Sequence, residues 1–226
     1  MNTRFSKALL RPRGGDIGLI AEIKLASPSA GKLGKREDMI RRIKMYELGR
    51  ADALSLVVAK ERFGGDAGMI EEAKKITHLP ILAKDFIIDP YQIYEAKVNG
   101  ASAILLIVKL VSKKTLIKFV DLCQKIGIEP IVEINDEKDL EKAVATTTAI
   151  IAVNARNLQT FAINVDQACR LMDKIPDRFI KLGFSGINSS NEVKKYQGAG
   201  AKGVLVGTSL MKAKNTKEFL MSLRGS

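Results

Sequence analysis

Eight apolar, β-branched runs alternate with helical patterns along the chain, and this alternation constrains the fold more than any other feature. The runs cover residues 18–24, 51–58, 80–84, 101–108, 129–134, 149–154, 179–184 and 201–207. Each run starts roughly 20 to 33 residues after the one before, which is the length of a strand–helix unit. Eight such units in one chain predict an α/β protein with the (β/α)₈ architecture of a TIM barrel.

Helical patterns with apolar residues three and four positions apart separate the runs. The clearest examples are residues 36–49, 112–127 and 190–200. A doubly wound open sheet is the structural alternative, but it usually needs fewer units, and no Gly-x-Gly-x-x-Gly turn follows the first run. No linker is recognisable. We therefore expect one barrel domain over residues 1–226, with a short N-terminal extension over about residues 1–17.

The chain is strongly basic, with 37 lysines and arginines against 25 aspartates and glutamates and a formal net charge of +12. Such a charge invites a nucleic-acid hypothesis. However, the lysines are scattered through every predicted helix, and no aromatic residues interleave with them as a stacking platform requires. We therefore expect no nucleic-acid partner, and we expect the basic field to attract an anionic small-molecule substrate.

The apolar runs and the cysteines indicate the cellular compartment of the protein. No apolar run approaches the roughly 20 residues that span a bilayer, and no signal peptide is recognisable. Cys123 and Cys169 lie far apart in helical patterns and match no metal-binding or redox spacing. We therefore expect a cytoplasmic protein with no membrane partner and no metal.

Charged and amide side chains stand where four of the apolar runs end. They are Glu22 and Lys24 at the first run, Lys84 at the third, Glu133 at the fifth, and Asn154 with Arg156 at the sixth. The C-terminal ends of barrel strands converge on one mouth, so these side chains are candidates for a common site. Any one of them alone would fit a salt bridge at the rim. The whole set would be a costly cluster of partly desolvated charge without a ligand.

Glycine-containing turns follow the last two runs and indicate a phosphate site. Backbone N–H groups of Gly186 and Gly207, with the hydroxyls of Thr208 and Ser209, can hold phosphate at a helix N-terminus. Ser27, after the first run, offers another hydroxyl. Glycine turns are common in barrels, so the signal depends on the basic mouth beside it.

Lysine and glutamate are the candidates for acid–base chemistry. The only histidine, His78, falls between a helical pattern and the third run, away from the expected mouth. A lysine that is buried, or that lies near another cation, has a lowered pKa. We therefore expect the lysines of the mouth to have lowered pKa values and to donate protons near neutral pH.

Several of these segments together resemble the indole-3-glycerol phosphate synthase family of tryptophan biosynthesis. The matching stretches include "IAEIKLASPSAG" (20–31), "PILAKDFIIDPYQIYEA" (80–96), "NARNLQTF" (154–161) and "LVGTSLM" (205–211). The shorter matches "EPIVEIND", "FGG" and "SGI" lie between them. The resemblance extends from Leu19 to about Met211, and the segment around "KDFIID" is highly specific.

The resemblance implies a reaction and the residues that perform it. The reaction is ring closure of 1-(2-carboxyphenylamino)-1-deoxyribulose 5-phosphate, with loss of carbon dioxide and water and with no cofactor. By position, Lys84 resembles the general acid and Glu133 its acid–base partner. Lys24 would face the substrate carboxylate and share the proton work, and Glu22 would hold the lysines in place.

The resemblance also implies a binding shell. Substrate-binding roles fall to Glu22, Asn154, Arg156, Phe63, Phe86 and Ser185, and phosphate-binding roles to Ser27, Gly186, Gly207 and Thr208. Phe63 and Phe86 would form apolar walls for the aromatic ring. We expect a monomer or a weak homodimer.

The chain departs from the family pattern at the mouth. Phe184 stands where the family has a glutamate, and Val58 and Ala59 stand where it has a threonine and an acidic residue. Ala155 and Asn157 replace a polar residue and an acid. Fewer acids in a lysine-rich mouth are expected to lower the lysine pKa values further.

Two other hypotheses remain open from the sequence. One is another phosphosugar barrel enzyme, either a phosphoribosylanthranilate isomerase type or an aldolase that forms a Schiff base on Lys84. The isomerase usually relies on a Cys and Asp pair at strand tips, where neither cysteine of this chain falls. The other hypothesis is a non-catalytic barrel that retains its phosphate site, which Phe184 and Ala59 favour.

Overall fold

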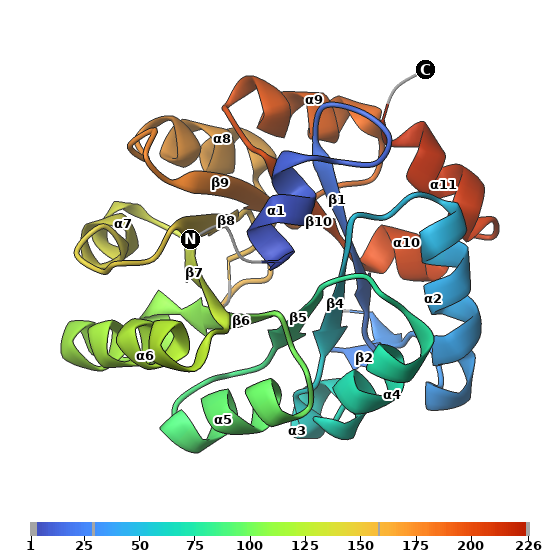
Figure 1. The fold of residues 1–226 in the computed structure, drawn as a ribbon. Helices are drawn as coiled ribbons and strands as arrows, with labels where there is room; N and C mark the ends of the chain where they lie inside the picture. The colour runs from blue at the N-terminus through green and yellow to red at the C-terminus, as the bar shows by residue number, and fades with distance from the viewer. Residues whose placement is uncertain (1–3, 29, 158, 225–226) are drawn as a thin grey trace.

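A closed barrel of eight parallel strands forms the centre of the computed structural model, which describes residues 4–28, 30–157 and 159–224 (Figure 1). The strands are β1 (Gly18–Ile23), β4 (Ala53–Val57), β5 (Ile81–Lys84), β6 (Ala103–Ile107), β7 (Glu129–Ile134), β8 (Ile150–Asn154), β9 (Ile180–Phe184) and β10 (Gly203–Val206). Each pairs with its neighbours in sequence order, and β1 pairs with β10 to close the ring. Every predicted strand is confirmed, and so is the (β/α)₈ barrel.

Helices surround the barrel (Figure 1). They are α2 (Met39–Leu48), α4 (Gly68–Ile76), α5 (Pro90–Val98), α6 (Lys113–Ile126), α7 (Glu137–Ala143), α8 (Val165–Asp173), α9 (Ser190–Gly198) and α11 (Thr216–Ser222). Shorter elements are α1 (Arg4–Leu10), α3 (Lys60–Phe63), α10 (Thr208–Lys212), 3₁₀ turns at Arg36–Asp38 and Val108–Leu110, and a hairpin of β2 (Ala26–Ser27) and β3 (Gly31–Lys32). No helix of the described ranges combines the length and apolar character that a membrane span requires.

Local sequence signals fix where several helices begin. Asp89 precedes α5, and its side chain accepts a hydrogen bond from the backbone N–H of Tyr91, while Gln92 completes a capping box. Ser189 and Glu192 form the equivalent box at the start of α9. Such caps satisfy backbone N–H groups that have no partner inside the helix. The loops that follow β5 and β9 at the mouth therefore end at Asp89 and Ser189.

The barrel strands are buried on both faces, as the near-continuous apolar runs predict. Their outward side chains pack with the helices in one large core. Their inward side chains form a second, smaller core that includes Ile20, Leu82 and Phe184. The polar residues described below lie above this inner core, at the C-terminal ends of the strands.

Helix α1 closes the end of the barrel that lies opposite the mouth (Figure 1). Phe5 and Leu9 are buried and belong to the inner core. Glu129, the first residue of β7, accepts hydrogen bonds from the backbone N–H groups of Phe5 at 2.7 Å and Ser6 at 3.1 Å. The described part of the N-terminal extension therefore covers the bottom of the barrel.

A buried carboxylate connects the two ends of the described chain. Asp52 accepts hydrogen bonds from the backbone N–H groups of Arg13 at 2.6 Å and Leu19 at 2.8 Å. The guanidinium of Arg224 lies 2.8 Å from the Oδ2 atom of Asp52, and both side chains are almost fully buried. Asp52 therefore holds the segment before β1 and the residue Arg224, which follows α11, at the start of β4.

Candidate active site

A cavity of about 440 Å³ opens at the C-terminal ends of the barrel strands. Every site residue predicted from the sequence lines it. They are Glu22, Lys24, Ser27, Phe63, Lys84, Phe86, Glu133, Asn154, Arg156, Ser185, Gly186, Gly207 and Thr208. Segments from across the whole chain therefore meet at one mouth, because parallel barrel strands present their C-terminal ends on the same side.

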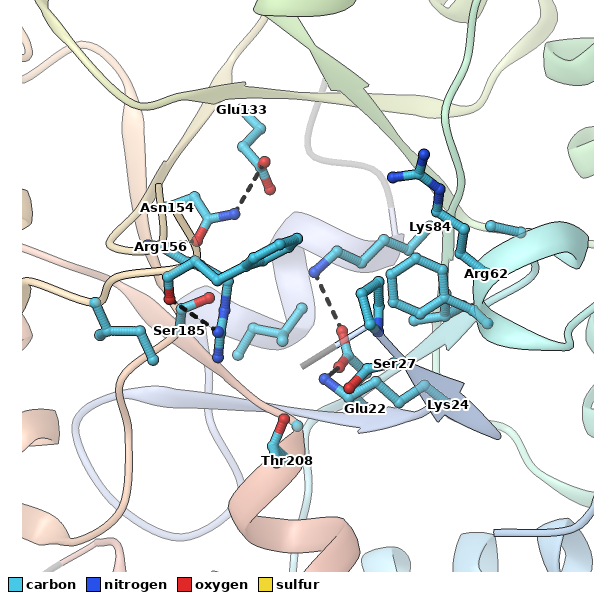
Figure 2. A pocket seen from close by; sticks show the side chains of 18 of the residues that line it. Glu22, Lys24, Ser27, Arg62, Lys84, Glu133, Asn154, Arg156, Ser185 and Thr208 are labelled. Atoms are coloured by element: carbon cyan, nitrogen blue, oxygen red, sulfur yellow. Dashed lines mark hydrogen bonds and ion pairs between the residues drawn. The ribbon is translucent and has the colours of Figure 1, made fainter. Parts of the chain in front are cut away.

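Glu22 joins the two lysines of the site. Its Oε1 atom lies 2.7 Å from Lys24 Nζ, and its Oε2 atom lies 3.1 Å from Lys84 Nζ (Figure 2). Burial opposes ionisation of Glu22, but the charges of Lys24 and then Lys84 outweigh it and lower the pKa of this carboxyl to about 2. Glu22 is therefore ionised at neutral pH and holds both ammonium groups, as expected.

The expectation of a lowered lysine pKa is wrong for Lys84. Burial lowers the pKa of its ammonium group, but the carboxylates of Glu22 and then Glu133 outweigh this effect and hold the pKa above its ordinary value. The burial of a lysine can be predicted from a sequence more readily than the number of carboxylates that surround it. At neutral pH Lys84 is a proton donor.

Glu133 stands across the cavity from Lys84 with one oxygen unused (Figure 2). The carboxyl is buried, and its Oε1 atom accepts a hydrogen bond from Asn154 Nδ2 at 3.0 Å. Its Oε2 atom has no hydrogen-bond partner among the described residues. Burial raises the pKa of Glu133, and the charge of Lys84 does not fully offset this. A buried, unpartnered acceptor is costly unless a ligand completes it.

Asn154 and Arg156 are held by the backbone at the end of β8. The backbone N–H of Arg156 donates to Asn154 Oδ1 at 3.0 Å, which orients the amide so that its Nδ2 group faces Glu133. Asn135, which sequence reasoning missed, donates from Nδ2 to the carbonyl oxygens of Asn154 and Arg156. The guanidinium of Arg156 donates from Nη1 to the carbonyl oxygen of Phe161 at 3.2 Å.

Phe184 fills the space below Lys84. Its side chain is fully buried in the inner core, and Lys84 Nζ lies 5.3 Å from the centre of its ring. A cation over an aromatic face is attracted to it. Glu22 and Glu133 hold the pKa of Lys84 above its ordinary value, although Phe184 contributes no charge.

The turns after β9 and β10 form one end of the cavity. Ser185, Gly186, Gly207 and Thr208 line this end. Ser209 also lines the cavity, and its hydroxyl donates to the carbonyl oxygen of Ile187 at 2.6 Å, which ties the two turns together. The expected phosphate-binding residues, Ser209 included, thus line one cavity.

Gly207 also permits the lysine–glutamate cluster to form. A Cβ atom at this position would lie 2.3 Å from Glu22 Oε1 and 3.1 Å from Lys24 Nζ. Any other residue would therefore displace the ion pair. The same contact places Lys24 directly beside the turn after β10, close to the expected phosphate end.

An aromatic wall closes the cavity near α3. The rings of Phe63 and Phe86 lie 6.1 Å apart between centroids and are tilted by 49°. Phe63 ends α3, and Phe86 follows β5 two residues after Lys84. Tilted ring pairs of this spacing are favourable and present apolar surface to a flat ligand.

Sequence reasoning missed several lining residues. These are Arg62, Asp85, Leu110, Phe161, Ile163, Ile187 and Asn188, together with residues beneath them in the strands. Most belong to loops whose path the apolar pattern does not encode. Arg62 sits in a single helical turn, which has no periodicity to reveal the direction of its side chains.

Histidine and cysteine lie away from the cavity. His78 stands between α4 and β5, at the opposite end of the strands. Cys123 and Cys169 are free thiols on α6 and α8. The described residues contain no group of three or more His, Cys, Asp or Glu side chains arranged to hold a metal ion.

Comparison with known proteins bears on the identity of this site. The family model of indole-3-glycerol phosphate synthase matches residues 1–223. The indole-3-glycerol phosphate synthase of Caldanaerobacter subterraneus subsp. tengcongensis is 40% identical over 93% of this chain and 83% of that protein. The enzyme of the same name from Lachnoclostridium phytofermentans is 36% identical over 97% of this chain and 80% of that protein.

Solved structures agree on the fold. A crystal structure of 3-hexulose-6-phosphate synthase superposes with a TM-score of 0.74, covering 92% of this chain and 98% of that one at 15% identity. That level of identity supports the barrel alone. The family match and the sequence relatives establish more: this chain belongs to the indole-3-glycerol phosphate synthase family.

Proposed function

We propose that the cavity closes the indole ring of indole-3-glycerol phosphate from 1-(2-carboxyphenylamino)-1-deoxyribulose 5-phosphate, with Lys84 as the first acid and Glu133 as the second. One observation supports this most strongly. A protonated lysine and a buried glutamate with a vacant oxygen face one cavity, and each has its own partner that fixes its position. Opposed proton donors around one substrate are the arrangement that ring closure followed by dehydration requires.

The first stage forms the carbon–carbon bond. The ring carbon that bears the carboxylate attacks the ketone carbon, and the ketone oxygen takes a proton from Lys84. The electron pair of the carboxylate bond then returns to the ring as carbon dioxide leaves. Glu22, which binds both lysines, stabilises the ammonium before the transfer and positions it.

The second stage removes water. Glu133 in its protonated form donates to the new hydroxyl group, which leaves as water. Lys84, neutral after the first stage, takes the proton from the carbon next to the ring nitrogen and is ready to donate again. Glu133 regains its proton from solvent, so one proton is consumed per turnover, as the loss of a carboxylate as carbon dioxide demands. The raised pKa of Glu133 suits a carboxyl that must carry a proton.

Binding contacts orient the substrate between these groups. The phosphate lies against the turns of Gly186 and Gly207, with the hydroxyls of Ser27 and Thr208. The aromatic ring lies against the wall of Phe63 and Phe86 in the same cavity. The substrate class is therefore a small anionic phosphosugar.

Two substitutions test the proposed roles. Lys84→Ala and Glu133→Gln are each expected to lower kcat at least about a hundredfold, the scale of general acid–base catalysis. Lys60→Ala is the control, because Lys60 is exposed on α3 outside the cavity. Near-wild-type turnover in both variants would contradict the proposed roles of Lys84 and Glu133.

A further inference from the structure

Arg62 is a cation of the cavity that has no partner among the residues that the structure describes. It lines the cavity from the middle of α3 (Figure 2). Within the described ranges it makes no hydrogen bond and no ion pair. Ala59, which lines the cavity beside α3, provides no carboxylate to neutralise it. An arginine at the wall of a cavity, with nothing to bind, is available for an anionic ligand.

The backbone of α3 is anchored beside the cavity, and the exposed side chain of Arg62 extends from it. Gly65 follows α3 at a place where a Cβ atom would lie 2.2 Å from the carbonyl oxygen of Val57, so the turn packs directly on the end of β4. The backbone N–H of Gly65 donates to the carbonyl oxygen of Ala59 at 3.2 Å and closes the segment on itself. Helix α3 is therefore a short, anchored element and not a free loop.

The other cations that line the cavity are already engaged. Lys24 and Lys84 share the carboxylate of Glu22, and Arg156 donates to the carbonyl oxygen of Phe161. Lys24 also lies against Gly207, on the side of the expected phosphate turns. The resemblance implies that Lys24 faces the substrate carboxylate, and the structure shows this ammonium group already bound to Glu22.

Arg62 is next to the aromatic wall, where a substituent of the substrate ring must lie. It immediately precedes Phe63, whose ring pairs with that of Phe86. Figure 2 shows Arg62 on the Lys84 side of the cavity and Thr208 on the opposite side. A ring held by the wall with its phosphate near Thr208 brings its ortho-carboxylate toward α3.

We propose that Arg62 binds the ring carboxylate of the substrate and selects carboxyphenylamino over phenylamino compounds. This inference rests on the proposed function. A guanidinium matches a carboxylate with two parallel hydrogen bonds, which an ammonium group does not reproduce. Arg62 thus orients the ring so that the carbon bearing the carboxylate faces the ketone near Lys84, and it acts as a positioning residue until carbon dioxide leaves.

Calorimetric binding of two unreactive ligands tests the inference without turnover. One ligand is 1-(2-carboxyphenylamino)-1-deoxyribitol 5-phosphate, which has a hydroxyl in place of the ketone. The other is the same compound without the carboxylate. We expect the wild-type protein to prefer the first by about tenfold or more, the scale of one charge-assisted pair. Arg62→Gln should bind the two with nearly equal affinity, and Arg62→Lys should retain part of the preference.

Lys60→Gln is the matched control, since it removes a neighbouring exposed cation of α3 and should leave the preference unchanged. A preference that survives in Arg62→Gln overturns the inference and leaves the proposed function intact. Equal binding of both ligands by the wild-type protein also overturns the inference alone. If the wild-type protein binds neither ligand, the proposed function fails, and the role of Arg62 fails with it.

Discussion

The ammonium group of Lys84 lies 3.1 Å from the Oε2 atom of Glu22, and the other oxygen of the same carboxylate binds Lys24. One buried carboxylate therefore holds two ammonium groups. This arrangement sets the protonation states of the site: Glu22 is ionised and Lys84 is charged. Among the described residues Glu133 has no direct cationic partner, and burial dominates its pKa.

The alkaline limb of the pH profile is expected to report Lys84. Its acid form is active, so kcat/KM is full below the pKa of Lys84 and falls as pH rises through it. Because that pKa is raised, the limb lies above the ordinary lysine value of 10.5. Glu22→Gln removes a negative charge beside the ammonium and shifts the limb to lower pH. Glu61→Gln, an exposed change outside the cavity, is the control. A limb that stays in place in Glu22→Gln would contradict the assignment.

Gly207→Ala is expected to disrupt the lysine–glutamate cluster. The new Cβ atom would lie 2.3 Å from Glu22 Oε1, so the carboxylate must move away from Lys24. We expect kcat/KM to fall at least about tenfold, because small displacements of positioned groups are costly in catalysis. Gly198→Ala is the control: nothing lies within 4 Å of a Cβ there, inside α9. Equal activity in the two variants would show that Gly207 is not needed for the cluster.

The ion pair of Asp52 and Arg224 is expected to stabilise the barrel. Arg224→Ala leaves a buried carboxylate without its cation, which costs about 3–5 kcal/mol of unfolding free energy in comparable sites. Urea unfolding should show a lower midpoint with an unchanged slope. Lys195→Ala breaks the exposed pair with Asp166 and should leave the midpoint nearly unchanged. Similar midpoints in both variants would contradict a stabilising role.

The barrel and the strand-tip residues follow from the sequence because one physical rule connects them. Buried parallel strands are apolar throughout, so a charged or amide side chain at the end of a run marks the mouth. Lys84, Glu133 and Asn154 all follow this rule and line the cavity. The position of each residue within its run was enough to bring them together.

Other features depend on contacts that no local pattern encodes. The direction of the Lys84 pKa shift depends on Glu22 and Glu133, which come from strands far away in the sequence. The helix α1 that closes the bottom of the barrel begins on hydrogen bonds to Glu129, more than a hundred residues later. Arg62 lies on one helical turn, too short for a periodic signal.

Formation of the indole ring of indole-3-glycerol phosphate by the wild-type protein is the most direct test of the proposed function. The chain contains no tryptophan and only four tyrosines, so indole fluorescence from the product rises over a low background. With 1-(2-carboxyphenylamino)-1-deoxyribulose 5-phosphate, we predict a rising indole signal in the wild-type protein and none on the same timescale in Lys84→Ala. A flat wild-type trace, with the substrate bound, would contradict the account and indicate a barrel that binds phosphosugars without this chemistry.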